Sequence, residues 1–322
     1  MRVLVTGGAG YVGSVSVEAL VSAGHDVVVL DDLSNGHRDS LPGGIRLVVG
    51  GYGDAATVRP LLAGSGVDAV LHCAARSLVG ESIADPALYY RENVGGGVAL
   101  LEALREAGVR RFVLSSTAAV YGMPDVVPIT EDAPLAPINP YGETKRTLEA
   151  ALRWYGSAYG LRSVSLRYFN VAGASASNGE VHDPETHLIP NALLTVLGRR
   201  AALDLFGDDF PTPDGTAVRD YIHVTDLAAA HVLALKKLVA RPESDIVNLG
   251  TNRGYSVLEV IRAVEAVTGR KVAREVRPRR LGDVPILLAS KEKAEKALGW
   301  TLRHSSLEEI IETAWRWHQK AK

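Results

Sequence analysis

Short apolar, β-branched runs alternate with longer amphipathic stretches through the first half of the chain. Several of the short runs contain three or four consecutive apolar residues, which is typical of strands buried on both faces of a parallel sheet. The expected strands are residues 2–6, 26–30, 46–49, 68–72, 112–115 and 163–167. The expected helices between them are residues 10–23, 55–63, 86–107 and 141–159. This alternation predicts an α/β fold built on a doubly wound parallel sheet.

The pattern changes after about residue 170. A loop-rich stretch at 174–186 leads into shorter mixed elements, with a strand expected at 245–249 and helices at 256–268 and 306–320. We therefore expect two lobes. Residues 1–170 form the sheet domain, and residues 171–322 form a smaller mixed α/β lobe over the carboxyl edge of the sheet, with some strands and helices crossing between the two.

Composition narrows the class of protein. The 322 residues are 47% hydrophobic and 22% charged, as in ordinary globular proteins, and the net charge of -2 gives no electrostatic footprint for nucleic acid. No apolar run is long enough to cross a bilayer, and the chain starts directly with a strand, which leaves no room for a signal peptide. The single cysteine, Cys73, excludes an intramolecular disulfide and fits a reducing compartment. We expect a cytoplasmic protein that acts on small molecules.

A glycine-rich turn follows the first expected strand. It reads Gly7-Gly8-Ala9-Gly10-Tyr11-Val12-Gly13 and opens a helix, so its glycines allow a tight turn, close approach of a pyrophosphate and close packing of helix on strand. The second strand ends in Asp31-Asp32, where a carboxylate can accept ribose hydroxyls and repel a 2′-phosphate. A plain βα turn explains the glycines but not the acidic pair. The pattern predicts a Rossmann-like dinucleotide site that prefers NAD to NADP.

Tyr141 and Lys145 stand four residues apart on an expected helix and therefore share one face. A free tyrosine titrates at about 10, so a base at neutral pH needs a lower pKa, which a nearby ammonium and a positive nicotinamide ring would favour. Thr117 ends the fifth strand, where ligand chemistry lies in such sheets. Taken alone, such a Tyr/Lys pair is typical of a solvated helix face.

In this setting the pair resembles the Tyr-x-x-x-Lys motif of the extended short-chain dehydrogenase/reductase family. The GxxGxxG spacing of residues 7–13, Cys73-Ala74-Ala75, Asn93 and Ser115-Ser116-Thr117 are similar to the same family. Four strings, at 80–82, 115–122, 166–170 and 214–224, resemble the UDP-glucose 4-epimerases, and the likeness covers nearly the whole chain. The most specific string is the last, Asp-Gly-Thr-Ala-Val-Arg-Asp-Tyr-Ile-His-Val.

This resemblance implies a set of site residues. It implies that Thr117, Tyr141 and Lys145 are catalytic, with Tyr141 taking the proton of the sugar O4 while the C4 hydrogen passes to NAD, and that no metal takes part. The implied NAD contacts are Gly7, Gly10, Tyr11, Val12, Gly13, Asp31, Asp32, Leu33, Asn35, Gly36, Gly51, Tyr52, Cys73, Ala74, Ala75, Asn93, Ser115, Tyr141, Lys145 and Tyr168. The implied contacts of the UDP-sugar are Val79, Thr117, Tyr141, Phe169, Asn170, His187, Leu188, Leu205, Phe206, Arg219, Tyr221, Arg280, Asp283 and Leu287.

The resemblance also implies a homodimer that pairs the helices at 86–107 and 141–159. Their apolar residues are expected on more than one face; these are Leu100, Leu101, Leu104, Leu148, Leu152 and Trp154.

Three positions depart from the family pattern. Gly50-Gly51-Tyr52 stands where a Gly-Asp pair usually contacts adenine, and Ser77, beside Arg76, stands where many members have a lysine. Gly95-Gly96-Gly97 replaces Asn-Gly-Thr and is expected to loosen a helix, at about 1 kcal/mol per glycine.

Several other activities are alternatives to the 4-epimerisation of UDP-glucose. A 4,6-dehydratase needs an Asp-Glu pair after the strand-end threonine, where this chain has Ala118-Ala119. A UDP-glucuronate or UDP-N-acetylglucosamine 4-epimerase stays open. Leu287 stands where a bulky tyrosine tends to exclude 2-acetamido sugars in the family, although it could simply pack in the core of the smaller lobe. A non-catalytic NAD-binding regulator, the alternative from another class, tends to lack the Tyr/Lys pair.

Overall fold

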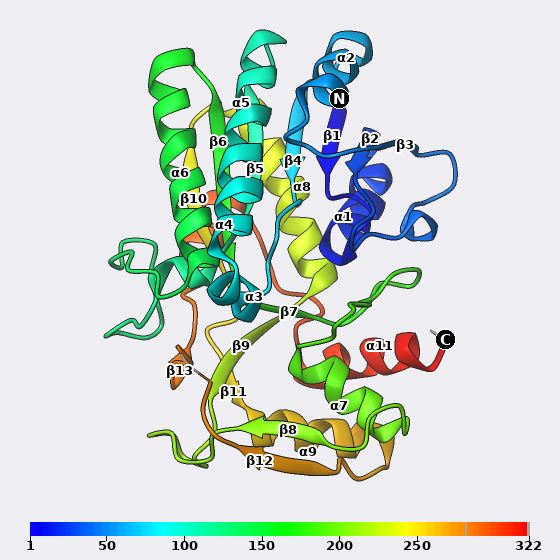
Figure 1. The fold of residues 1–322 in the computed structure, drawn as a ribbon, viewed down its shortest axis with the longest axis vertical. Coiled ribbons are helices and arrows are strands. Elements are labelled where there is room, and N and C mark those ends of the chain that lie inside the picture. Colours follow the sequence, from blue (N-terminus) through cyan, green and yellow to red (C-terminus); the bar gives the residue numbers. More distant parts are fainter. Residues whose placement is uncertain (281, 321–322) are drawn as a thin grey trace.

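The computed structural model describes residues 1–280 and 282–320, and Figure 1 shows a larger lobe built on a sheet above a smaller mixed lobe. The large sheet is parallel throughout, in the order β10-β6-β5-β4-β1-β2-β3. Its strands are β1 (Arg2–Thr6), β2 (Asp26–Asp31), β3 (Arg46–Val49), β4 (Ala69–His72), β5 (Arg111–Thr117), β6 (Arg162–Tyr168) and β10 (Asp245–Leu249). The predicted strands are confirmed to within two residues at each end.

Helices cover both faces of this sheet. One face carries α1 (Tyr11–Ser22), α8 (Val224–Ala240) and α10 (Glu292–Leu298), and the other carries α2 (Ala55–Ser65), α5 (Gly97–Glu106) and α6 (Pro140–Tyr159). Within β1, Val3 and Val5 pack toward the first group of helices and Leu4 toward the second. This alternation is the two-residue period of a strand, and because both faces are buried the middle of β1, residues 3–5, is continuously apolar, as the sequence predicts.

The stretch expected as one helix at 86–107 has three parts. These are α4 (Pro86–Tyr89), a π-helical turn (Tyr90–Gly96) and α5. A Cβ on Gly96 would lie 3.0 Å from Cε2 of Tyr52, and a Cβ on Gly97 would lie 2.9 Å from Cδ1 of Leu148. These two glycines therefore let neighbouring segments pack against the helix, a role that the expected loosening of the helix did not include.

The smaller lobe contains two small sheets and three packed helices. Its strands are β7 (Asn170–Ala172), β8 (Leu203–Phe206), β9 (Val218–His223), β11 (Gly254–Ser256), β12 (Arg274–Arg277) and β13 (Ile286–Leu287). Its helices are α7 (Leu188–Val196), α9 (Val257–Thr268) and α11 (Leu307–Lys320), and they share one core. The predicted helices at 256–268 and 306–320 are confirmed.

The chain crosses between the lobes after residue 170. Strand β9 of the smaller lobe leads at once into α8, which covers the large sheet, and β10 pairs with β6 in that sheet. The strand expected at 245–249 is therefore correct in extent, but it lies in the larger lobe, because Val247 and Leu249 are buried there in the same core as α8. No helix among the described residues has the length and apolar character to span a membrane.

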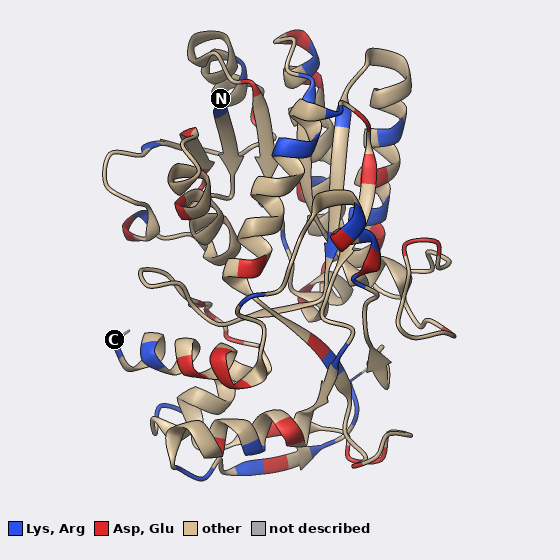
Figure 2. Cartoon of the chain, turned by 180° about the vertical axis from the view of Figure 1, so that it is seen from behind, with Lys and Arg blue, Asp and Glu red and all other residues tan. Residues whose placement is uncertain are grey.

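Acidic and basic residues are interspersed over both lobes, as Figure 2 shows, in keeping with a net charge of -2.

Candidate active site

A cavity of about 500 Å³ opens at the carboxyl edge of the large sheet, where ligands bind in such folds. Both lobes contribute to its walls. The predicted cofactor residues that line it are Gly7, Gly10, Tyr11, Val12, Gly13, Asp31, Asp32, Asn35, Gly36, Gly51, Tyr52, Cys73, Ala74, Ala75, Tyr141, Lys145 and Tyr168. The predicted substrate residues that line it are Thr117, Tyr141, Phe169, Asn170, His187, Leu188 and Tyr221. The fold therefore brings most of the predicted site residues together.

The glycine turn between β1 and α1 shows why these glycines are needed. A Cβ on Gly13 would lie 1.9 Å from the carbonyl oxygen of Gly7, and one on Gly7 would lie 2.5 Å from the backbone nitrogen of Ala74. Gly10 is different, because its Cβ would meet only Gly7 O, at 3.5 Å, and Gly10 lines the cavity. No side chain caps α1, so its first N–H groups are left for a ligand. This cradle fits a dinucleotide pyrophosphate.

The acidic pair after β2 holds the turn in place. Asp31 is buried, and its two carboxylate oxygens accept hydrogen bonds from the backbone nitrogens of Ala9 and Leu33, each at 2.9 Å. Burial raises the pKa of Asp31, and these two hydrogen bonds oppose the rise. Asp32 is exposed and lines the cavity. An ionised carboxylate has about four lone-pair sites, so both acids keep acceptors free for ribose hydroxyls. Leu33 does not line the cavity and contributes through its backbone.

The first turn of α6 places Tyr141 beside the end of β5. Asn139 caps this helix, since its Oδ1 accepts a hydrogen bond from the Gly142 nitrogen at 2.8 Å. A Cβ on Gly142 would lie 2.4 Å from the carbonyl oxygen of Ala119, so only glycine lets the turn pack this closely. The Tyr141 phenol as a result lies beside the Thr117 hydroxyl, near enough for that hydroxyl to lower the pKa of the phenol. The two side chains predicted to share one substrate oxygen are thus in contact.

The charges of the Tyr/Lys pair differ from the expectation. Burial raises the pKa of Tyr141 to about 12, and the Thr117 hydroxyl only partly offsets it. Burial also lowers the pKa of Lys145 to about 8. The Lys145 ammonium donates to the carbonyl oxygen of Ser115 at 2.8 Å. Desolvation dominates at both groups, so the lowered pKa expected for Tyr141 from the ammonium together with a nicotinamide ring stays a prediction for the NAD-bound chain.

Two predicted cofactor residues hold segments next to the cavity without lining it. The Asn93 amide accepts from the backbone nitrogen of Arg76 and donates to its carbonyl oxygen, at 2.8 and 2.9 Å, and also donates to Thr144 on α6 at 3.1 Å. The Ser115 hydroxyl lies 3.0 Å from Nε2 of His231. Neither Asn93 nor Ser115 lines the cavity, so both position neighbouring segments.

A second group of predicted substrate residues lies beyond the cavity lining. Asp283 is 3.8 Å from the guanidinium of Arg219 and 3.1 Å from that of Arg280, which in turn lies over the ring of Phe206 at 4.7 Å. Arg219 precedes Tyr221 of the lining by two residues on β9, so this basic group continues from the cavity into the smaller lobe.

Three further predicted substrate residues also lie outside the lining. The side chain of Leu205 is buried in the core that α7 and α9 share, so a contact with substrate would be left to its backbone. Val79 begins the short helix α3 (Val79–Ala84) and is exposed. Leu287 packs beside Phe169 in the cluster that also contains Ala118, which places it next to the cavity rather than in the core of the smaller lobe.

Sequence reasoning missed several residues of the wall. The lining residues that it did not assign are Leu30, Ser34, Gly50, Arg76, Ser77, Leu78, Glu81, Glu92, Val171, Ala172, Glu180, His182, Asp183, Pro184, Ile189 and Pro190. Many of them belong to the segments that follow β4 and β7. The carboxyl ends of parallel strands meet at one edge, so the loop after β4 was predictable in principle.

Comparison with known proteins supports this geometry. The sequence profile of the NAD dependent epimerase/dehydratase family matches residues 3–250. A UDP-glucose 4-epimerase of Corynebacterium glutamicum is 52% identical over 315 residues, which cover 98% of this chain and 95% of that protein.

Two solved structures have the same fold over the whole chain. The UDP-glucose 4-epimerase of Brucella ovis, in complex with NAD, matches with a TM-score of 0.94 at 46% identity, over 98% of this chain and 97% of that one. The UDP-glucose 4-epimerase of Bifidobacterium longum, in complex with NAD⁺ and UDP, matches with a TM-score of 0.94 at 35% identity, over 100% and 99%. With its glycine cradle and its Thr117–Tyr141 contact in place, the chain belongs to the NAD dependent epimerase/dehydratase family.

Proposed function

We propose that this chain is an NAD-dependent epimerase that inverts C4 of a UDP-hexose and interconverts UDP-glucose and UDP-galactose. The observation that carries the proposal is the contact of Tyr141 with Thr117 on the wall of a cavity that also contains the dinucleotide cradle. The relatives described above act as UDP-glucose 4-epimerases, and two of their structures hold NAD.

The two lobes bind different ligands. Residues 1–170 hold NAD through the cradle and the Asp31-Asp32 pair, and NAD, when bound, supplies the acceptor and then the donor of the C4 hydrogen. Residues 171–322 hold the UDP moiety, where Arg219 and Arg280 would form charge-assisted hydrogen bonds with its phosphates.

Proton transfer belongs to Tyr141. Its phenol oxygen takes the proton of the sugar O4 and later returns it, and Thr117 holds the same sugar oxygen in line. The 4-keto sugar must turn between the two steps so that the hydrogen returns to its opposite face. Lys145 ties α6 to the end of β5 through its hydrogen bond to the carbonyl oxygen of Ser115.

The rival activities fit less well. Ala118 and Ala119 follow Thr117 and carry no exchangeable proton, so the acid/base pair of a dehydratase is missing at that place. A non-catalytic NAD-binding regulator would have no use for a tyrosine buried against Thr117. UDP-glucuronate and UDP-N-acetylglucosamine differ from UDP-glucose only in substituents of the hexose. They are therefore the alternative substrates against which UDP-glucose must be compared.

The test uses the purified chain alone. An absorbance scan should reveal bound NAD(H), and incubation with UDP-galactose, without an added oxidant, should yield UDP-glucose. UDP-glucuronate and UDP-N-acetylglucosamine are assayed in parallel. Conversion of UDP-glucuronate with none of UDP-galactose would replace the proposed substrate, and no conversion of any sugar by NAD-loaded protein would refute the activity.

We also propose a homodimer in the cytoplasm. Helices α5 and α6 lie side by side along one edge of the larger lobe (Figure 1). Leu100, Leu101, Leu104, Leu148 and Leu152 are all buried within the chain, so they cannot form the second apolar face that the sequence suggested. The large hydrophobic side chains of these two helices that stay exposed are Val98, Trp154 and Tyr159. Sedimentation at micromolar concentration should give a mass of two chains, and the single free cysteine suits a reducing compartment.

A further inference from the structure

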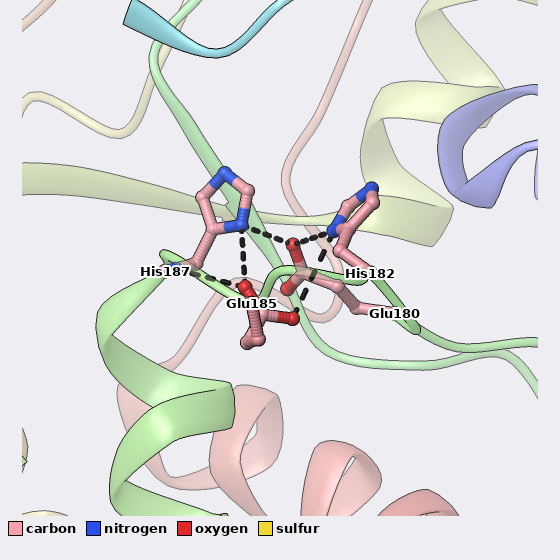
Figure 3. Close-up of side chains that lie close together, drawn as sticks. All are labelled: Glu180, His182, Glu185 and His187. Atoms are coloured by element: carbon pink, nitrogen blue, oxygen red, sulfur yellow. Dashed lines mark hydrogen bonds and ion pairs between the residues drawn. The ribbon is translucent and has the colours of Figure 1, made fainter. Parts of the chain in front are cut away.

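Two histidines and two glutamates converge in the segment between β7 and α7. Glu180, His182, Glu185 and His187 offer one ligand atom each, and these atoms all lie within 4.8 Å of one another. Figure 3 shows the Nδ1 sides of both rings facing the two carboxylates, with the Nε2 atoms pointing away. Neither the glutamates nor His182 has a role in the proposed reaction.

The distances between these atoms match the edges of a metal coordination sphere. From Nδ1 of His187, Glu180 Oε1 lies at 2.8 Å and Glu185 Oε1 at 2.9 Å. From Nδ1 of His182, Glu180 Oε1 lies at 3.1 Å and Glu185 Oε2 at 3.8 Å. A tetrahedral zinc ion with ligands at about 2.0–2.1 Å requires ligand atoms about 3.3 Å apart. The four side chains are therefore spaced as such an ion needs.

A second observation concerns the nitrogen of His182 that faces the cluster. Its Nδ1 atom is buried and makes no hydrogen bond, although Glu180 Oε1 is only 3.1 Å away. This nitrogen therefore lies at ion-pair distance from the Glu180 carboxylate without the alignment of a hydrogen bond. A lone pair directed at a shared central point explains both the short distance and the missing hydrogen bond.

The charge of the cluster also calls for a cation. The side chains of Glu180 and Glu185 are only 5% and 9% exposed, so two negative charges lie largely away from water. One divalent ion, or two protonated imidazoles, would balance them.

Two imidazolium rings fit the geometry less well than one ion. The ring centroids of His182 and His187 are 5.3 Å apart, so two like charges would stand close together. Both Nδ1 atoms also approach the same oxygen of Glu180, and only His187 also hydrogen-bonds Glu185. A single central cation contacts all four groups and brings no like charges together.

The surrounding elements hold this cluster in place. The indole of Trp317 on α11 donates to the Glu180 carbonyl oxygen at 3.3 Å, and the Asn191 amide on α7 donates to the Glu185 carbonyl oxygen at 3.2 Å. The ring of Tyr11 on α1 stands edge-on to that of His182, at 6.4 Å. The segment is thus fixed from three helices, as a structural metal site requires.

We propose that Glu180, His182, Glu185 and His187 form a binding site for one zinc-like divalent transition-metal ion. Two imidazole nitrogens with two carboxylate oxygens suit Zn²⁺ and Co²⁺, whereas Ca²⁺ and Mg²⁺ prefer oxygen ligands alone. Because Glu180, His182 and His187 also line the cavity, the ion would fix this part of its wall. The sequence-based expectation of no metal overlooked the spacing Glu-x-His-x-x-Glu-x-His at 180–187.

The experiment measures metal binding by the untagged, NAD-loaded chain after treatment with a chelator. Titration with ZnCl₂ should show one tight site, and CoCl₂ should give the intense visible bands of tetrahedral Co²⁺. The variant Glu180→Gln/His182→Gln should lose at least ~10-fold in affinity, since even residues that only support metal ligands contribute about that much. The matched control is His304→Gln/Glu309→Gln, because that pair is also in contact, at 2.7 Å, but lies on the surface outside the cluster.

Thermal unfolding provides a second readout that does not depend on activity. Zn²⁺ should raise the Tm of the parent and of the control variant, because an ion that binds only the folded chain stabilises it, and should leave the Glu180/His182 variant unchanged. If that variant does not fold, His182→Gln alone replaces it under the same criteria. A parent that binds no tight Zn²⁺, or a variant that binds it as tightly as the parent, would overturn the proposal.

Discussion

Lys145 donates its side-chain ammonium to the backbone carbonyl oxygen of Ser115, at 2.8 Å, although it stands one helical turn after Tyr141. This bond ties α6 to the strand that ends at Thr117. Burial moves both groups of the pair toward their neutral forms, with a pKa of about 12 for Tyr141 and about 8 for Lys145. The charge that favours the phenolate therefore comes with the cofactor, whose oxidised nicotinamide ring is positive.

Replacing Tyr141 by phenylalanine should remove the base and leave the fold unchanged, since only one oxygen is lost. Turnover should fall by at least ~10²-fold, the usual contribution of a general base. The control is Tyr155→Phe, which removes a phenol oxygen from the same helix where it bonds Glu102 at 2.5 Å. Steady-state assays compare the turnover of the parent and the two variants at equal NAD content. Near-normal turnover of Tyr141→Phe would show that another group takes the proton of the sugar O4.

Two adjacent arginines should differ in their effect on UDP binding. Arg280 lies over Phe206 and pairs with Asp283 beside Arg219, whereas Arg279 lies over Phe210 and pairs with Asp209. Hydrogen bonds to charged groups contribute about 1.5–3 kcal/mol, so Arg280→Ala should raise the Kd of UDP by about 10- to 100-fold.

Arg279→Ala is the matched control and should change the Kd of UDP by less than ~3-fold. Calorimetric titration of both variants with UDP makes the comparison. Equal losses in the two variants would show that the arginines act only through general charge.

The residue at 287 should influence which sugars are accepted. Leu287 packs beside Phe169 and Ala118, next to the catalytic Thr117, and leucine is smaller than the tyrosine found in some members of the family. We expect measurable epimerisation of UDP-N-acetylglucosamine by the parent. Leu287→Tyr should suppress that activity more than the activity on UDP-glucose. An equal loss on both sugars would mean that residue 287 acts through folding.

The glycines of the π-helical turn should respond to alanine in opposite directions. A Cβ on Gly95 would meet only the Tyr90 carbonyl oxygen, at 3.8 Å, so Gly95→Ala should stabilise the protein by up to about 1 kcal/mol through helix propensity. A Cβ on Gly97 would lie 2.9 Å from Leu148 Cδ1 in the core, so Gly97→Ala should cost about 1–3 kcal/mol. Urea unfolding measures both. A gain in both variants would mean that the helix tolerates a side chain on either face.

The sequence predicts the fold well because its signals are local. Strand β1 is continuously apolar at residues 3–5, which the sheet buries, and the glycine spacing around Gly10, together with the acidic pair after the second strand, indicates a dinucleotide-binding turn. Pairing between distant segments leaves no such signal. Nothing local distinguishes a strand at 245–249 in the large sheet from one in the smaller lobe, and nothing local shows that Gly97 makes room for Leu148.

In the site, too, features with a local sequence signal could be predicted and features that depend on distant segments could not. The contact between Tyr141 and Thr117 was predictable, because strand ends and helix starts meet at one edge. The pKa of Tyr141 was not, because desolvation depends on everything packed around the phenol. Glu180 and His182 read as ordinary loop residues until the chain brings their side chains together.

The central claim is that the hydrogen on sugar C4 leaves and returns within one closed cavity. The most direct measurement supplies the purified chain with UDP-galactose carrying deuterium at C4, in ordinary water and without an added oxidant. The account predicts UDP-glucose that keeps the deuterium at C4, because that hydrogen never exchanges with solvent. UDP-glucose with ordinary hydrogen at C4, or no UDP-glucose from NAD-loaded protein, would contradict it.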